Sequence, residues 1–115
     1  MKARLKSFVH AWNGLRDIVS GQANFRIHLM AAILVILAGF LADLTPMEWC
    51  VIILAIFLVL AMEAANTAIE KAVDLLSPEY HETARKAKDT GAAAVLLSAI
   101  ASVAAGLIIF LPKIL

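Results

Sequence analysis

Hydrophobic residues gather in three long segments that carry no charge, at residues 29–42, 49–62 and 92–111. A helix needs roughly 20 residues to cross the hydrocarbon core of a bilayer, and only the third segment has that length alone. The first reaches it by starting near Phe25, and the second only if the polar residues after Met62 are included. The pattern predicts an all-α integral membrane protein with three spanning helices. Their expected bounds are about residues 25–44, 48–76 and 90–111.

The first 20 residues have a different pattern, in which apolar positions recur at helical spacing and basic residues occupy the other faces. Because this segment has no continuous apolar stretch, we do not expect a cleavable signal peptide. We expect residues 1–20 to form an amphipathic helix that lies in the membrane interface. The alternative is an ordinary surface helix on a soluble core. The apolar positions are Leu5, Phe8, Val9, Trp12, Leu15 and Val19.

Two polar connections separate the apolar segments. Thr45 and Glu48 have the spacing of a capping box, which predicts a helix start at this point. Ser77 and Pro78 end the following helix, because proline disfavours helical backbone at the residue before it. A chain of 115 residues with connections this short is expected to be a single domain, residues 1–115.

The composition agrees with a membrane location. Apolar residues make up 63% of the chain and the mean hydropathy is +0.89, whereas globular chains contain roughly 45–50% apolar residues. The net charge of +1 gives no indication of nucleic-acid binding. Cys50 is the only cysteine, which excludes an internal disulfide and a cysteine-based zinc site.

The basic residues lie almost entirely on one side of this topology. Nine of the ten lie before or at the start of the first predicted span, or between the apolar segments 49–62 and 92–111, and Lys113 is the exception. Connections rich in Lys and Arg remain in the cytoplasm. We therefore expect a multi-pass protein with its N-terminus and the 71–90 connection on the cytoplasmic side.

One face of the second predicted span carries polar groups. At 100° per residue, Glu63, Asn66, Glu70 and Asp74 lie at about 0°, 300°, 340° and 20° around the helix. A charged group inside a bilayer costs at least ~2.5 kcal/mol and usually has a function. These groups could share a divalent cation, or act as general base and metal ligand in phosphoryl transfer. The alternative is that Glu70 and Asp74 already lie in headgroups or water.

Lys88 and Asp89 immediately precede the third span. The lysine could contact nucleotide phosphates or serve only as a positively charged anchor at the membrane surface. Gly91 and the alanines after it permit close contact between helices. No glycine-rich loop of the P-loop type is present. Three membrane helices in one chain offer little surface to shield a site, so we expect an oligomer with sites between subunits.

The order and spacing of these residues resemble the small bacterial integral-membrane diacylglycerol kinase family, which also includes undecaprenol kinases. The resemblance implies a homotrimer in the bacterial cytoplasmic (inner) membrane, with active sites between subunits on the cytoplasmic side. It also implies ATP-dependent phosphorylation of a lipid hydroxyl with Mg²⁺. The matching segments are Glu63, "NTAIE" at 66–70, Asp74, "AKDTGAAAVL" at 87–96, "WNGLR" at 12–16 and "ANFRIHL" at 23–29.

The resemblance also implies roles for individual residues. Glu63 matches the general base for the lipid hydroxyl, Glu70 matches a magnesium ligand, and Asn66 would orient both. Lys88 and Asp89 match nucleotide contacts. The connection after the second span matches the family segment that contacts the base and sugar of the nucleotide. The alternative is a plain solvated connector. Its residues are Glu79, Tyr80 and His81.

Two positions depart from the family pattern. Gln22 stands where the family usually has a second metal-binding glutamate, and its carbonyl oxygen can bind a cation but carries no charge. Either the enzyme works with weaker metal binding, or Gln22 marks an inactive or engineered variant. His10 stands where one branch of the family has a tyrosine that contacts the nucleotide.

The motifs divide between two acceptor lipids. "WNGLR", "SPEYHE" and "KDTGAAAVL" are more similar to the diacylglycerol kinase branch, and "NFRIHL", "NTAIE" and "IFLP" to the undecaprenol kinase branch. We expect diacylglycerol as the acceptor, giving phosphatidic acid, with undecaprenol and undecaprenyl phosphate as the alternative. A small transporter or a catalytically silent scaffold would also be short and apolar. Carboxylates at one end of a span, beside an asparagine and a Lys-Asp pair, fit a nucleotide site better.

Overall fold

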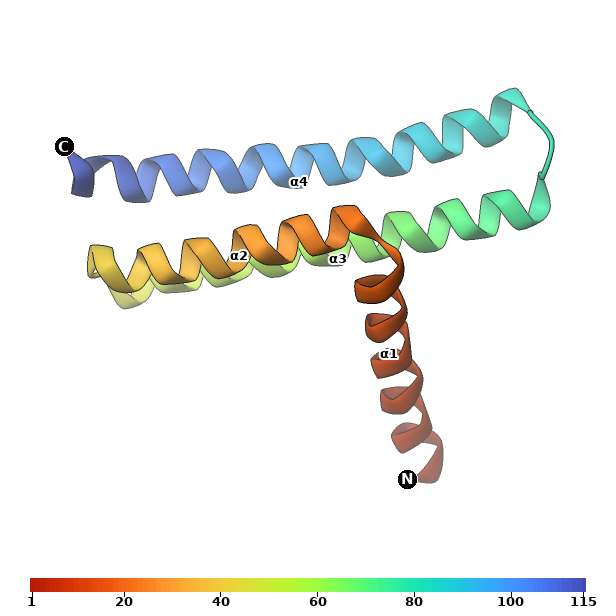
Figure 1. The fold of residues 1–115 in the computed structure, drawn as a ribbon, viewed down its shortest axis with the longest axis horizontal. Helices are drawn as coiled ribbons and strands as arrows, with labels where there is room; N and C mark the ends of the chain where they lie inside the picture. Colours follow the sequence, from red (N-terminus) through yellow and green to blue (C-terminus); the bar gives the residue numbers. More distant parts are fainter.

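The computed structural model describes all 115 residues and consists of four α-helices joined by short turns. They are α1 (Lys2–Gly21), α2 (Ala23–Ala42), α3 (Pro46–Leu76) and α4 (Glu82–Ile114). In Figure 1, α2, α3 and α4 run lengthwise beside one another, and α1 leaves them at a steep angle. The predicted all-α architecture is confirmed, and α2, α3 and α4 are each long and apolar enough to cross a membrane.

The turn between α2 and α3 follows local sequence signals. α2 is followed by Asp43, which adopts the left-handed conformation common at helix C-termini (φ 57°). The Thr45 hydroxyl accepts a hydrogen bond from the backbone N–H of Glu48 at 3.2 Å, and the Glu48 carboxylate accepts one from the backbone N–H of Thr45 at 2.9 Å. The predicted capping box is confirmed, with Pro46 at the start of the helix.

The connection between α3 and α4 is shorter than predicted. α3 stops at Leu76, in front of the Ser-Pro pair, as expected. α4 begins at Glu82, ahead of the membrane helix expected from about residue 90. His81 caps it, because its Nδ1 accepts a backbone N–H of the first turn at 3.1 Å. Arg85 forms ion pairs with Glu82 and Asp89 on the same helix. Such pairs stabilise an exposed helical turn, so the polar segment continues the helix.

The junction between α1 and α2 is held by a side chain. Gln22 has extended backbone between the two helices (φ −124°, ψ 109°). Arg26 of α2 donates from Nη1 to the carbonyls of Val19 and Ser20 at 2.9 and 3.0 Å. These carbonyls at the end of α1 have no partner within the helix. Arg26 therefore fixes the direction in which α1 leaves α2.

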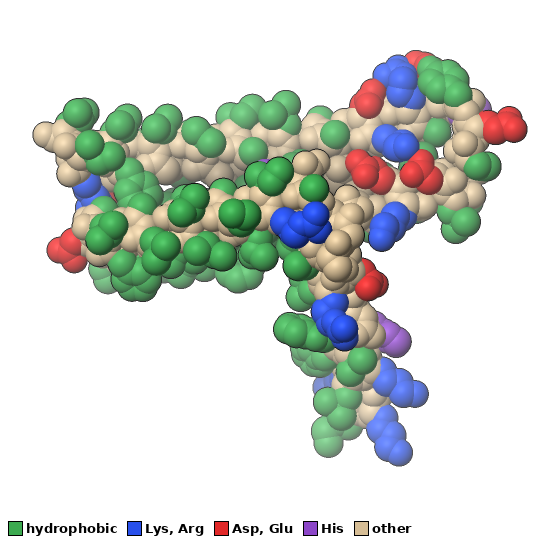
Figure 2. Space-filling model, viewed as in Figure 1, with side chains coloured by type: hydrophobic (Ala, Val, Ile, Leu, Met, Phe, Trp, Pro, Cys, Tyr) green, Lys and Arg blue, Asp and Glu red, His purple; other side chains and the backbone are tan.

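The three long helices differ in length. At 1.5 Å per residue, α2 spans about 30 Å, α3 about 46 Å and α4 about 50 Å, against about 30 Å for the hydrocarbon core of a bilayer. α3 packs against both α4 and α2. The end of α3 and the start of α4 therefore extend past α2 as a helical hairpin (Figure 1). Charged side chains gather on this hairpin and on α1, with a few more at the opposite end of the molecule (Figure 2).

A single chain buries little of its apolar surface. Only 13 of the 115 residues are buried, and the main hydrophobic cluster, near the α2–α3 turn, is formed by Leu44, Ile52 and Ile109. Large side chains such as Phe40 and Ile108 are about three-quarters exposed. Exposed apolar surface is unfavourable in water by roughly 25 cal/mol per Å². These faces are therefore suited to contact lipid tails or further helices.

Candidate active site

The polar face of α3 changes from buried to exposed along the helix. Glu63 and Asn66 are only 7% and 9% exposed, Glu70 is half-buried, and Asp74 is exposed. These residues cover about 16 Å along the helix axis. A buried carboxylate requires a specific partner, whereas an exposed one is satisfied by water. The partners of Glu63 and Asn66 therefore define the inner part of the site.

Glu63 lies beside His28 of α2. Glu63 Oε1 and His28 Nε2 are 3.3 Å apart, and the two side chains are 10% and 28% exposed. The nearby Thr67 hydroxyl donates to the backbone carbonyl of Glu63, not to its carboxylate. The sequence analysis included His28 only as part of the segment "ANFRIHL" at 23–29 and gave it no role. The signal that could have identified it is a titratable residue at the end of an apolar helix.

Asn66 holds Glu70 and faces α4. Its Nδ2 donates to Glu70 Oε1 at 3.2 Å, and no hydrogen bond joins it to Glu63. Its Oδ1 is buried without a hydrogen-bond partner. A Cβ added at Gly91 of α4 would lie only 2.5 Å from this Oδ1. The glycine therefore allows α4 to approach Asn66 closely, as the small residues predicted.

Lys88 and Asp89 have different partners. Lys88 Nζ is 2.8 Å from Asp74 Oδ1, which joins α4 to α3. Asp89 Oδ2 is 2.7 Å from Arg85 Nη1, within α4. All four side chains are at least 40% exposed, and ion pairs in such positions contribute about 0–1 kcal/mol. Lys88 and Arg85 can therefore exchange their carboxylate partners for a phosphate at little cost.

A cleft of about 290 Å³ opens at the tip of the hairpin, between the end of α3, the connection and the start of α4. Asp74 and Arg85 line it. Arg85 was missed as a site residue because the sequence presents it only as one of several basic residues. Figure 2 shows both charge signs around this tip. The cleft also contains five of the predicted nucleotide contacts: Glu79, Tyr80, His81, Lys88 and Asp89.

Besides Glu63 and Asn66, three further predicted site residues lie outside this cleft. Glu70 is on α3 between Asn66 and the cleft, His10 is exposed on α1, and Gln22 is half-buried at the α1–α2 junction. No group of three or more His, Cys, Asp or Glu side chains in the chain is close enough to hold a metal ion. A metal bound at Glu70 would therefore need ligands from phosphate, water or another chain.

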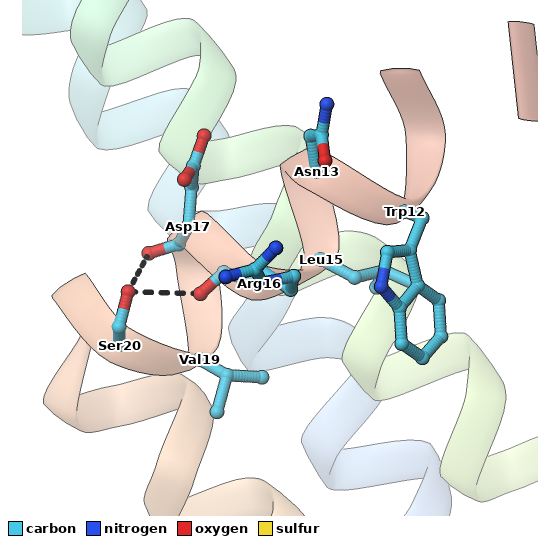
Figure 3. A pocket seen from close by; sticks show the side chains of 7 residues that line it. All are labelled: Trp12, Asn13, Leu15, Arg16, Asp17, Val19 and Ser20. Atoms are coloured by element: carbon cyan, nitrogen blue, oxygen red, sulfur yellow. Dashed lines mark hydrogen bonds between the residues drawn. The ribbon is translucent and has the colours of Figure 1, made fainter. Parts of the chain in front are cut away.

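A larger hollow, of about 550 Å³, lies along α1. All seven residues around it belong to this one helix, and Figure 3 shows their side chains pointing in different directions. The Ser20 hydroxyl donates only to the backbone carbonyls of Arg16 and Asp17. A ligand site needs polar groups that converge from several directions. The hollow is the open flank of α1 and is not part of the candidate site.

These features define a small α-helical protein with three helices able to span a membrane and a charged hairpin beside one buried carboxylate. A sequence profile of prokaryotic diacylglycerol kinase matches residues 9–110. The chain belongs to the prokaryotic diacylglycerol kinase family, which confirms the resemblance seen in the motifs.

Relatives in this family carry two names. The chain is 44% identical over 109 residues to the undecaprenol kinase of Bacillus subtilis, covering 95% of this chain and 89% of that protein. It is 44% identical over 112 residues to the diacylglycerol kinase of a Synechocystis species, covering 96% of this chain and 64% of that protein. It is 35% identical over 99 residues to the diacylglycerol kinase of Escherichia coli, covering 86% of this chain and 81% of that protein.

Proposed function

We propose that the protein is an ATP-dependent lipid kinase that phosphorylates the hydroxyl of diacylglycerol and yields phosphatidic acid. The observation that carries this proposal is the position of Glu63. This buried carboxylate follows the apolar part of α3 directly and precedes the charged hairpin. A lipid hydroxyl can approach from the apolar side and a nucleotide from the polar side.

Glu63 acts as the general base in this proposal. The lipid hydroxyl gives its proton to the Glu63 carboxylate while its oxygen attacks the γ-phosphorus of ATP. The new oxygen–phosphorus bond forms, the bond from the γ-phosphorus to the bridging oxygen breaks, and ADP leaves with that electron pair. A general base must lie within hydrogen-bond reach of the proton it removes. The burial of Glu63 keeps water from competing for that position.

The hairpin cleft binds the nucleotide. Phosphoryl transfer depends mainly on positioning and on neutralising phosphate charge. Lys88 and Arg85 supply positive charge, and both are held by exposed ion pairs that a phosphate can replace. Tyr80 is 79% exposed and offers an aromatic face to the base. Asp89, Glu79, His81 and, from α1, His10 complete the proposed contacts.

The family uses ATP, and we propose that Mg²⁺ accompanies it at Glu70. Magnesium binds through one or two carboxylates together with substrate phosphates. Glu70 fits this requirement, because it is half-buried and accepts only one hydrogen bond from a side chain, that of Asn66. When bound, the ion supplies positive charge that neutralises the phosphates. Gln22 would add a neutral carbonyl oxygen.

Replacing Gln22 with glutamate is expected to lower the magnesium concentration for half-maximal activity by about tenfold, because a charged ligand replaces a neutral one. The measurement is the initial rate at fixed ATP across a magnesium titration, with Gln22→Ala as the matched control. An identical magnesium dependence in Q22E and the parent protein would remove residue 22 from the metal site. Activity in Q22E alone would identify the present sequence as an inactive form.

We also propose how the chain sits in the membrane. Residues 1–115 form one domain of a bacterial cytoplasmic membrane protein, with the N-terminus and the hairpin in the cytoplasm. The distribution of the basic residues supports this orientation. α1 lies in the interface as an amphipathic helix, and in Figure 2 its hydrophobic and its basic side chains gather largely on opposite sides.

A homotrimer with active sites between subunits is the proposed assembly. Two observations support an oligomer. One chain leaves wide apolar faces exposed, and it contains no group of three or more His, Cys, Asp or Glu side chains that could hold a metal ion at Glu70. Association of membrane helices would cover these faces and bring ligands from a second chain.

Undecaprenol is the second candidate acceptor. The match to the Bacillus subtilis undecaprenol kinase extends over 89% of that protein, and the segments "NFRIHL" and "IFLP" resemble the same branch. Both lipids present one terminal hydroxyl to the site. The product would then be undecaprenyl phosphate.

The proposed function is tested by γ-phosphate transfer from ATP with magnesium, using purified protein in mixed micelles. Diacylglycerol and undecaprenol are offered separately. We expect faster transfer to diacylglycerol. Transfer to undecaprenol with negligible transfer to diacylglycerol would change the acceptor and retain the lipid kinase. No transfer to either lipid, from a folded oligomer, would refute the kinase proposal for this sequence and favour a non-enzymatic scaffold.

A further inference from the structure

The contact between His28 and Glu63 links two different helices at the inner end of the polar face. His28 Nε2 and Glu63 Oε1 are 3.3 Å apart. No other side chain forms a hydrogen bond or ion pair with the Glu63 carboxylate. The neighbouring polar groups have other partners, because Asn66 bonds Glu70 and Asp74 pairs with Lys88. The orientation of the Glu63 carboxylate therefore depends on His28.

His28 also borders an apolar groove. The groove has a volume of about 470 Å³ and is lined by residues of α2, α3 and α4. Most of its lining is Ala, Val, Ile, Leu and Phe, and His28 is its only titratable residue. The imidazole therefore stands between the apolar space among the helices and the buried carboxylate.

We propose that His28 is the positioning residue of the general base. The 3.3 Å separation is within reach of a hydrogen bond, which the imidazole forms by donating from Nε2 to Glu63 Oε1. This bond fixes the plane of the carboxylate and leaves Oε2 free to receive the proton of the lipid hydroxyl. Without it, the carboxylate can rotate about its side-chain torsions, and the productive geometry is populated less often. The inference rests on the proposed kinase function and adds to it the group that aligns its base.

The geometry gives different expectations for two replacements. His28→Leu removes the donor and keeps an apolar side chain of similar size. His28→Gln keeps an N–H donor, because the terminal amide nitrogen of glutamine lies at nearly the same distance from the backbone as Nε2 of histidine. A bond that only joins α2 to α3 would lower protein stability in the leucine variant and leave kcat of the folded protein unchanged. If the bond aligns the base, kcat falls in the leucine variant, and glutamine restores kcat.

The test measures kcat, and KM for ATP, for the full-length protein and both variants in mixed micelles with saturating lipid. We expect His28→Leu to lower kcat by about 10- to 100-fold, as small misplacements of reacting groups do, with KM for ATP changed by less than about twofold. We expect His28→Gln to recover most of the lost kcat. In a Glu63→Gln background, His28→Leu should cause no further loss, because the two residues act as one unit.

The outcomes separate this inference from the proposed function. If the parent protein transfers no phosphate, the kinase proposal fails. If the parent is active and His28→Leu matches it, the positioning role fails and the kinase remains. Equal losses for leucine and glutamine would also overturn the inference, as would a further loss from His28→Leu in the Glu63→Gln background. Elution as the parental oligomer confirms that each variant is folded.

Discussion

Replacement of Glu63 by glutamine is expected to lower kcat by about 100-fold or more, since loss of a general base costs 10²–10⁴-fold in rate. Glutamine has nearly the same shape, and it can still contact His28, so the fold and the ATP cleft should be retained. The amide cannot accept the hydroxyl proton at neutral pH. The measurement is the rate of γ-phosphate transfer at saturating ATP and lipid, together with KM for ATP.

Glu48→Gln is the matched control, because Glu48 is a partly buried carboxylate at the opposite end of α3. It pairs with Lys113 at 3.1 Å and belongs to the capping box at Thr45. Glutamine also serves in a capping box, so the helix start should be preserved and activity unchanged. Activity of Glu63→Gln within about twofold of Glu48→Gln would exclude Glu63 as the base.

Replacement of Gly91 by alanine is expected to destabilise the protein by about 1–3 kcal/mol, as overpacking of a close contact does. The added Cβ would meet Asn66 Oδ1 at 2.5 Å. Either α4 moves away from α3 or Asn66 rotates and loses its hydrogen bond to Glu70. Both responses displace the proposed metal ligand, so activity should fall with stability. Denaturant unfolding in micelles and a magnesium titration of the rate measure the two effects.

Gly106→Ala on the same helix is the control for this variant. A Cβ at Gly106 would meet nothing within 4 Å. Alanine favours a helix over glycine by about 1 kcal/mol, so this change should be neutral or slightly stabilising. If Gly91→Ala were as stable and as active as Gly106→Ala, the close approach of α4 to Asn66 would not exist in the assembled protein.

The helices and their limits could be predicted because their causes are local. Segment length and hydropathy identify the three long helices, and the Thr45 capping box and the proline at residue 78 set two of their ends. The position of α4 was harder to predict. The composition of its polar first turns at Glu82 and Arg85 permits a helix without requiring one, and the side-chain pairs and the His81 cap make them helical.

Much of the candidate site could be predicted for the same reason. Residues 63, 66, 70 and 74 share one face because a helix is rigid and regular over about three turns. Residues 79–81 and 88 had to lie near the end of α3 because a short connection makes consecutive helices antiparallel neighbours. Chain geometry over short sequence distances decides both features.

The register between helices could not be obtained in this way. Gly91 faces Asn66 and Lys88 faces Asp74 because α4 packs against α3 in one particular register. That register depends on how small and large side chains interlock along both helices. The pairing of His28 with Glu63 is even harder to predict from the sequence, because it depends on how α2 is rotated against α3 across a separate turn. Helical periodicity places each polar residue on a face, but contacts between distant segments arise only when all the faces pack at once.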